Sequence, residues 1–358
     1  MKKIDFFLLG IVACLTLFGL FMVYDVSSFI AFRDFNDKYH YIKDQMLWAA
    51  IGFTALFFFS FFDYRKLYNF AIPLLIGAIL LLVLVFIPGV GIRALGAHRW
   101  INLGFTTLQP AEFVKLSLAI YLAAWFSHKE KGRLFAFLLL LGLVSLLVLL
   151  QPDMGTASII LFEALMVYFI SGGNISHFLL LLPVMLVGGI FIILVAPYRL
   201  ARLTAFLTID KSLQSSSYHV KQILIALGSG GIFGLGVGNS LQKYAYLPEN
   251  VTDSIFPIIA EEFGFLGAGV LVGLYILFVW RGFVIAGSAK DQFGKLLAGG
   301  IISFLGIQII INLAAMTALF PLTGVPLPFI SYGGSALVID LGSVGILLSI
   351  ARYKDGNK

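Results

Sequence analysis

Ten runs of apolar residues follow one another along the chain, and each approaches the roughly 20 residues that a helix needs to cross a bilayer. Within lipid, a spanning segment must satisfy its own backbone polar groups, which favours helices. We therefore predict an all-α integral membrane protein, a polytopic bundle of about ten transmembrane helices. The predicted segments are 5–29, 46–62, 70–87, 111–126, 134–150, 154–171, 177–195, 254–280, 295–318 and 336–351.

The composition fits a membrane bundle and excludes several other classes. Hydrophobic residues make up 60% of the chain and charged residues 12%, which is about half the charged fraction of a soluble domain. The one cysteine, Cys14, cannot form a disulfide within the chain. Basic residues beside membrane helices account for the net charge of +6, so we expect no nucleic-acid partner. The first run is too long for a signal peptide and lacks a small-residue cleavage site, which predicts an uncleaved first helix.

Lysine and arginine set the expected orientation. They are densest in the short segments on the side of the N-terminus, which predicts that both termini are cytoplasmic. The longest segment without an apolar run, about 196–253, then lies on the outer side. Its Tyr, Leu, Ile and Gly content predicts a large ordered extracytoplasmic loop with a short surface helix over 218–227. We predict a single membrane domain over 1–358.

An acidic residue closes this loop where the eighth apolar run begins. Asp253 ends the sequence Tyr-Leu-Pro-Glu-Asn-Val-Thr-Asp at 246–253. Asp and Thr favour helix N-caps, so Asp253 could cap the following helix. A carboxylate at the membrane face is also where a base for a lipid-borne substrate must lie, and the two roles do not exclude each other. Glu261 and Glu262, two turns deeper, either have buried basic partners or line the same site.

A second polar group precedes the fourth run. Gly-Ala-His-Arg-Trp at 96–100 is followed by Gln-Pro-Ala-Glu-Phe-Val-Lys at 109–115. Glu112 and Lys115 are three residues apart and share a helix face, so they could form a simple ion pair. Alternatively, Lys115 could bind a diphosphate as a point charge, and Arg99 could bind one through two hydrogen bonds.

Three further motifs have weaker interpretations. Gln-Pro-Asp at 151–153 indicates the start of a helix. The glycines of 228–238 are not followed by the Gly-Lys-Ser/Thr of a nucleotide P-loop. They indicate either a closely packed turn or backbone N–H groups that face a phosphate. Three prolines within 321–335 break any helix and indicate either a re-entrant loop that lines a site or a plain turn. Glu163 and Asp340 lie within apolar runs, as part of a polar pathway or of buried pairs.

Together and in this order, these motifs resemble those of the SEDS family, the proteins of shape, elongation, division and sporulation. The resemblance spans nearly the whole chain, and Ser240 with Gln242 and Lys243 resembles the FtsW branch more than the RodA branch. The motifs that carry it are the Gln-Lys-Tyr-Ala-Tyr-Leu-Pro-Glu-Asn-Val-Thr-Asp run with Ala-Glu-Glu-Phe-Gly, the Pro-Leu-Pro-Phe-Ile-Ser-Tyr-Gly-Gly-Ser run, Gly-Ala-His-Arg-Trp, and Gln-Pro-Ala-Glu-Phe-Val-Lys.

The resemblance implies an inverting peptidoglycan glycosyltransferase that polymerises lipid II into glycan strands on a polyprenyl diphosphate carrier. It implies Asp253 as the essential aspartate, which we assign as the base. A divalent cation, Mg or Mn, is expected to assist the departing diphosphate, and no organic cofactor is expected. Residues expected to bind substrate or diphosphate are Glu112, Lys115, Arg99, Arg199, Arg202, Lys243 and Ser331.

The chain departs from the family pattern at several places, two of which lie beside Asp253 and Arg99. Val251 stands two residues before Asp253, where the family commonly has a histidine. His98 stands where it often has an arginine. Neither departure removes an acid or base that the resemblance assigns.

The resemblance also implies partners and a location. Expected partners are lipid II, the polyprenyl diphosphate-linked glycan, a class B penicillin-binding protein that crosslinks new strands, and other divisome or elongasome membrane proteins. The expected location is the bacterial cytoplasmic membrane, and the division septum for an FtsW-like protein. Two rival functions stay open at this point: a flippase for the lipid-linked precursor, and a non-catalytic division scaffold.

Overall fold

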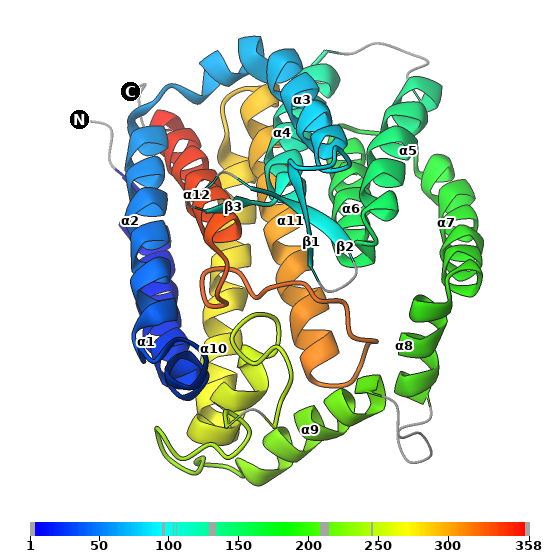
Figure 1. Cartoon of the computed structure of the whole chain (residues 1–358). Coiled ribbons are helices and arrows are strands. Elements are labelled where there is room, and N and C mark those ends of the chain that lie inside the picture. Colours follow the sequence, from blue (N-terminus) through cyan, green and yellow to red (C-terminus); the bar gives the residue numbers. More distant parts are fainter. Residues whose placement is uncertain are drawn as a thin grey trace.

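The computed structural model describes residues 4–94, 97–102, 104, 106–128, 134–207, 215–244 and 246–354. Within these ranges, each of the ten predicted apolar runs forms a helix (Figure 1). These helices are α1 (Phe6–Phe35), α2 (His40–Phe61), α3 (Leu67–Leu84), α4 (Pro110–Phe126), α5 (Leu134–Leu150), α6 (Met154–Ile170), α7 (Ile175–Val195), α10 (Ile255–Ser288), α11 (Gln292–Met316) and α12 (Gly334–Lys354).

The lengths and hydropathies of these helices confirm a membrane protein. In the described part of the chain, six segments are long and apolar enough to cross a bilayer, namely α1, α2, α3 with the preceding turn η1 (Tyr64–Lys66), α10, α11 and α12. The helices α5 and α6 are apolar but shorter, at 17 residues each. Leucines and phenylalanines that face outward from the bundle are exposed, as expected of side chains that meet lipid.

The helix α11 lies in the middle of the bundle and is buried along most of its length (Figure 1). It packs on α4, α6 and α10. Small residues allow this close approach, because a side chain at Gly300 would meet Val167 of α6 and Ala119 of α4. The core around α11 therefore fixes the relative positions of the helices that carry the polar residues.

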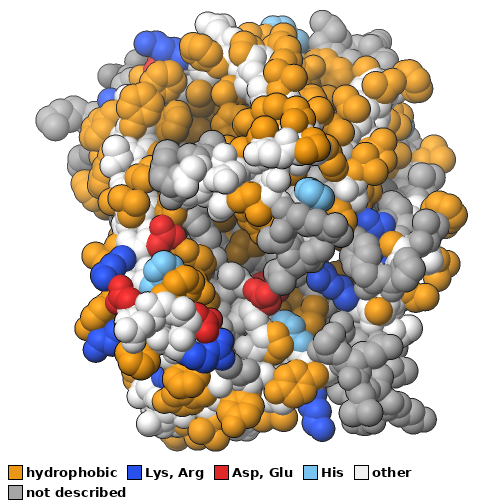
Figure 2. Space-filling model, in the orientation of Figure 1, with side chains coloured by type: hydrophobic (Ala, Val, Ile, Leu, Met, Phe, Trp, Pro, Cys, Tyr) orange, Lys and Arg blue, Asp and Glu red, His pale blue; other side chains and the backbone are white. Residues whose placement is uncertain are grey.

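Two further helices form the end of the bundle opposite to the two ends of the described chain (Figure 1). They are α8 (Pro197–Leu207) and α9 (Ser215–Ser229). The helix α9 includes the surface helix that we predicted over 218–227. On the face drawn in Figure 2, most charged side chains gather toward this end, and hydrophobic side chains cover much of the opposite part.

A small antiparallel sheet joins α3 to α4, and the sequence analysis did not predict it. Its strands are β1 (Gly91–Ala94), β2 (Ala97–Asn102) and β3 (Thr107–Leu108), in the order β1-β2-β3. Ile101 of β2 pairs with both Gly91 and Leu108. The sheet packs against the start of α4 and places Arg99 beside the α5–α6 connection.

The glycine-rich segment 228–238 pairs with a break in α10. Gly264 interrupts that helix with a φ of 68° and a ψ of −170°. Leu235 N–H and Gly236 N–H donate to the carbonyl oxygens of Glu261 and Glu262, so backbone groups freed by the break find partners. Two of these glycines leave no room for a side chain, since a Cβ at Gly230 would collide with the Ala260 carbonyl and one at Gly234 with the Glu262 carbonyl. Of the two interpretations of this motif, the structure supports the closely packed turn.

Candidate active site

Asp253 lies in a turn, residues 249–254, that leads into α10 at the end of the bundle formed by α8 and α9. Four neighbouring parts of the protein hold this Asp253 turn. Tyr332 N–H donates to the Val251 carbonyl at 3.0 Å, and Asn312 Nδ2 of α11 donates to the Asp253 carbonyl at 2.9 Å. Asn250 Nδ2 donates to the Lys243 carbonyl at 3.2 Å. His219 of α9 lies 2.8 Å from the Ser254 hydroxyl through Nε2.

Asp253 does not cap α10. The N-cap is Ser254, without a side-chain cap hydrogen bond, so the capping interpretation of Asp253 was wrong. The Asp253 side chain is buried, and its carboxylate accepts a hydrogen bond from Thr252 Oγ1 at 3.3 Å. Thr252 Oγ1 also lies 3.0 Å from Glu249 Oε2, which brings two carboxylates close together. Because the Asp253 carboxylate does not cap a helix, it is available to act on a substrate.

The surroundings of Asp253 make it a carboxylate that gains a proton easily. Burial first, and then the negative charge of Glu249, raise the pKa of Asp253 to about 7. The hydrogen bonds of the turn and the positive charge of Arg202 act in the opposite direction and are outweighed. A base works best with a pKa near the working pH, and Asp253 meets that condition.

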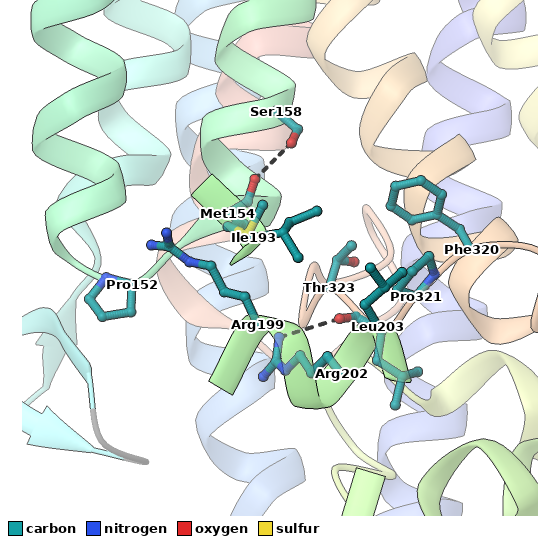
Figure 3. A pocket seen from close by; sticks show the side chains of 11 residues that line it. Pro152, Met154, Ser158, Ile193, Arg199, Arg202, Leu203, Phe320, Pro321 and Thr323 are labelled. Carbon is teal, nitrogen blue, oxygen red and sulfur yellow. Dashed lines mark hydrogen bonds between the residues drawn. The ribbon is translucent and has the colours of Figure 1, made fainter. Parts of the chain in front are cut away.

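A cavity of about 110 Å³ carries two of the predicted arginines (Figure 3). Arg199 and Arg202, both from α8, line it together with apolar side chains of α6, α7 and the α11–α12 connection. Arg202 Nη1 donates to the Leu322 carbonyl at 3.3 Å. The pairing of guanidinium groups with apolar walls suits a ligand that joins an anionic group to a lipid chain.

The same α11–α12 connection links the cavity to Asp253. Leu322 and Thr323 line the cavity, and the next residue, Gly324, faces Asp253, whose Oδ2 would lie 3.9 Å from a Cβ at that position. Arg202 lines the cavity and its charge acts on Asp253. The structure therefore brings together Asp253, Arg199 and Arg202.

Arg99 lies at the edge of this group. Its guanidinium donates to the carbonyl oxygens of Gln151 and Pro152, and Arg199 Nη2 donates to the Leu149 carbonyl at 3.3 Å. Two arginines from distant elements thus hold the end of α5 and the turn that follows it, and Pro152 of that turn lines the cavity. Asp153 accepts from Thr156 N–H at 3.0 Å, which confirms the predicted helix start.

Lys115 and Glu112 lie apart from this group, inside the bundle. Lys115 is fully buried, and its Nζ lies 2.7 Å from Glu112 Oε2 and 2.6 Å from Gln308 Oε1 of α11. Gln308 in turn donates to the Pro326 carbonyl at 3.0 Å. The ion pair that we considered for Glu112 and Lys115 is present, and it reaches the proline-rich segment through Gln308.

Lys243 forms a separate cluster. Its Nζ lies 3.0 Å from both oxygens of Asp25 on α1 and 2.9 Å from Glu262 Oε1 on α10. Glu262 thus has a buried basic partner, which is one of the two alternatives that we considered for it. Glu261 accepts hydrogen bonds from the hydroxyls of Ser229 and Ser240.

Ser331 is buried in the irregular segment 321–333, which is folded into the protein as a re-entrant loop would be. Its hydroxyl accepts a hydrogen bond from Leu327 N–H at 2.9 Å, and its carbonyl accepts one from Gln45 Nε2 at 3.2 Å. The next residue, Tyr332, donates to Asp44 at 2.5 Å. Ser331 thus holds the loop that contacts the Asp253 turn.

Across the described residues, no three His, Cys, Asp or Glu side chains gather closely enough to hold a metal ion. The protein side chains described do not form a metal site by themselves. The divalent cation, Mg or Mn, that we expect stays a prediction.

Sequence reasoning missed His219 and Asn312, which hold the Asp253 turn from α9 and α11. Asn312 is 59 residues from Asp253 along the chain, and its amide also donates to the Val325 carbonyl at 2.7 Å. A buried Asn in an apolar helix needs a partner, and that was the available signal.

The fold and the site define a polytopic membrane protein with a buried carboxylate next to an arginine-lined apolar cavity. Comparison with known proteins agrees with this class. The family model of the cell cycle proteins FtsW, RodA and SpoVE matches residues 6–356. The chain belongs to this family.

Relatives of this chain match over almost the full length of both proteins. Stage V sporulation protein E of Bacillus subtilis (strain 168) is 40% identical over 355 residues, covering 98% of this chain and 97% of the relative. A probable peptidoglycan glycosyltransferase FtsW of Geobacter sp. (strain M18) is 39% identical over 359 residues, covering 98% of each. The Geobacter name is that of the FtsW branch, and the Bacillus name is that of a sporulation protein of the same family, so the FtsW-like branch stays a prediction.

Solved structures share the fold. A peptidoglycan synthase complex described as coordinating polymerization and crosslinking contains a chain with a TM-score of 0.83 and 29% identity, with 100% of both chains covered. An aspartate-to-alanine mutant of the rod shape determining protein RodA of Thermus thermophilus has a TM-score of 0.75 and 28% identity, again over 100% of both chains.

Proposed function

We propose that this chain polymerises lipid II into glycan strands on a polyprenyl diphosphate, with Asp253 as the base. The protein is a peptidoglycan glycosyltransferase, as its family and its FtsW relatives indicate. One observation carries the residue assignment: Asp253 is buried, its pKa is raised to about 7, and it lies beside a cavity lined by Arg199 and Arg202.

In the proposed reaction, a hydroxyl of the acceptor sugar attacks the anomeric carbon of the donor. The new carbon–oxygen bond forms as the bond to the diphosphate breaks, with inversion at that carbon. Asp253 takes the hydroxyl proton. Arg199 and Arg202 bind the diphosphate and stabilise the negative charge that it gains on leaving.

The remaining candidates take supporting roles in this proposal. Arg99 holds the turn that carries Pro152 at the cavity. Lys115 and Lys243 are each already paired with carboxylates, so we assign them and Glu112 to the placement of helices around the site. Ser331 holds the loop next to the Asp253 turn. The apolar walls of the cavity receive the first part of the polyprenyl chain.

We also propose a class B penicillin-binding protein as partner, in the bacterial cytoplasmic membrane with both termini in the cytoplasm, and at the division septum. The related peptidoglycan synthase complex supports such a partner. The common position of the two described chain ends, opposite to α8 and α9, supports the arrangement of the termini (Figure 1).

The test is glycan synthesis from lipid II by the purified protein, with the wild type and Asp253→Asn side by side. We expect the variant to lose at least about 100-fold in rate, as removal of a general base does. Asp34→Asn is the control, because it removes an exposed carboxylate that pairs with the adjacent Arg33. A wild-type rate for Asp253→Asn would end the base assignment.

A further inference from the structure

His219 is the histidine that lies at the Asp253 turn, although it comes from a different element. It belongs to α9, and its Nε2 lies 2.8 Å from the hydroxyl of Ser254, the residue after Asp253. Ser254 is fully buried and is the N-cap of α10, yet its side chain makes no cap hydrogen bond. The hydroxyl of Ser254 is thus used to join the turn to α9.

The surroundings of His219 favour its neutral form. Burial first, and then the positive charge of Arg202, lower the pKa of His219 to about 4, so the imidazole is neutral at pH 7. A neutral imidazole nitrogen can accept the hydrogen bond of a hydroxyl. The α8 residue Arg202 therefore acts electrostatically on both His219 and Asp253.

The turn is held partly by hydrogen bonds of its own. Glu249 adopts a left-handed φ of 50°, and Ser254 N–H and Thr252 N–H both donate to its carbonyl, at 3.1 and 3.2 Å. The other hydrogen bonds described above join the turn to Asn312 of α11, to Tyr332 and to Lys243. In the described part of the chain, the hydrogen bond of His219 joins the turn to α9, and α8 with its arginines packs on α9.

We propose that His219 is a positioning residue, which through Ser254 fixes the Asp253 carboxylate relative to the arginines of α8. The proposal rests on the proposed function of Asp253. The charged groups that act on Asp253 are Glu249 in the turn and Arg202 on α8. From α11 and the α11–α12 connection, the neutral Asn312 and Gly324 face the turn.

A looser turn has a measurable consequence. Water would then reach Asp253, and its pKa would fall back toward 3.8 because burial is the main cause of the raised value. The carboxylate would also spend less time in the reactive position, which costs between about tenfold and a hundredfold in rate for a displacement of about 1 Å. A variant that merely unfolds part of the protein lowers the active fraction but leaves the pH profile of the remainder unchanged.

The experiment measures kcat and KM for lipid II against pH, with His219→Ala, Ser254→Ala, the double variant and His219→Gln. We expect both single alanine variants to lose at least about tenfold in kcat. The acid limb of the profile, where kcat falls as Asp253 gains a proton, should move to lower pH. KM should stay within about twofold of the wild-type value. The double variant should lose no more than either single variant, since both remove one contact. His219→Gln, whose amide can reach Ser254, should recover most of kcat.

His177→Ala is the matched control. His177 is a partly buried histidine whose Nδ1 lies 2.6 Å from the hydroxyl of Tyr168, far from Asp253 along the chain. It should leave the acid limb unchanged. If His219→Ala and Ser254→Ala also leave the limb unchanged, or if their losses add, His219 is not a positioning residue.

The outcome for Asp253 separates this proposal from the proposed function. If Asp253→Asn is inactive while both alanine variants behave as His177→Ala does, only the role of His219 fails. If Asp253→Asn keeps the wild-type rate and pH profile, the assignment of the base fails first, and with it the reason for positioning the turn. Should His219→Ala not fold, Ser254→Ala and His219→Gln still decide the matter.

Discussion

At the scale of single residues, the chemistry of Asp253 depends on its neighbours more than on its own identity. Its carboxylate is buried and shares Thr252 with Glu249, and the hydrogen bonds of the turn and the positive charge of Arg202 offset burial only in part. A salt-bridged aspartate would be a weak base at neutral pH. The arrangement around Asp253 instead keeps its proton affinity high, as proton abstraction requires.

Glu249→Gln should move the acid limb of the rate profile to lower pH. The negative charge of Glu249 raises the pKa of Asp253, so a neutral amide lets Asp253 ionise at lower pH. Above about pH 8 the carboxylate is ionised in both proteins, and kcat should differ by less than about threefold. Lipid II polymerisation at a series of pH values measures this, and a shift to higher pH would contradict the assigned charges.

Asp253→Asn should make the protein more stable at alkaline pH while it loses activity. The pKa of Asp253 is raised from 3.8 to about 7 in the folded state, so the folded state binds more protons than the unfolded state between those values. The free energy of unfolding therefore falls as pH rises through this range. The full loss, up to a few kcal/mol, is reached above pH 7. Thermal unfolding in detergent at pH 5 and pH 8 tests this: the advantage of Asn should grow with pH.

The sequence could indicate Asp253 but not its surroundings. The motif at 246–253, together with its position at the end of a long loop, was enough to select Asp253. Its partners come from α9, α11 and the proline-rich segment. Local spacing carries no signal for such distant contacts, which is why the N-cap interpretation failed. Likewise, Lys243 was expected at the diphosphate, but its partner Asp25 lies 218 positions away.

At the scale of elements, the apolar runs were sufficient to predict ten helices because lipid leaves the backbone no other way to satisfy its polar groups. The sheet of β1, β2 and β3 was missed because its strands are only 4, 6 and 2 residues long, and they show no clear alternation. The glycines of 228–238 were recognised as a motif. Their role required the break in α10 at Gly264, which in the sequence is only one more glycine.

Gly234→Ala tests this pairing of segment and helix. A Cβ at Gly234 would strike the Glu262 carbonyl, whereas one at Gly238 would meet nothing within 4 Å. Both glycines have a φ of 84°, so Gly238→Ala carries the same left-handed backbone cost, about 1 to 2 kcal/mol. Gly234→Ala should destabilise the protein further, by about 1 to 3 kcal/mol, measured as a lower melting temperature than that of Gly238→Ala. Equal melting temperatures would mean that the segment can move away from α10.

At the scale of the whole molecule, the two ends of the bundle carry different parts of the chain. The two described chain ends lie together, and α8, α9 and the Asp253 turn lie at the opposite end (Figure 1). The distribution of Lys and Arg along the chain predicts the same division between a cytoplasmic and an outer side. Several of the basic residues on which that prediction depends, such as Lys129, Lys131 and Arg133, lie outside the described residues.

Cysteine labelling in intact cells tests which end faces outward. In a Cys14→Ser background, Tyr246→Cys places a thiol at an exposed position near the Asp253 turn, and Lys290→Cys places one at an exposed position between α10 and α11. A membrane-impermeant maleimide should label the cysteine at 246 and reach the one at 290 only after the cells are opened. The proposed function places polymerisation at the outer face, so we expect Asp253 to face that side. Labelling of position 290 but not 246 in intact cells would place Asp253 at the cytoplasmic face, where it could not extend a cell-wall strand.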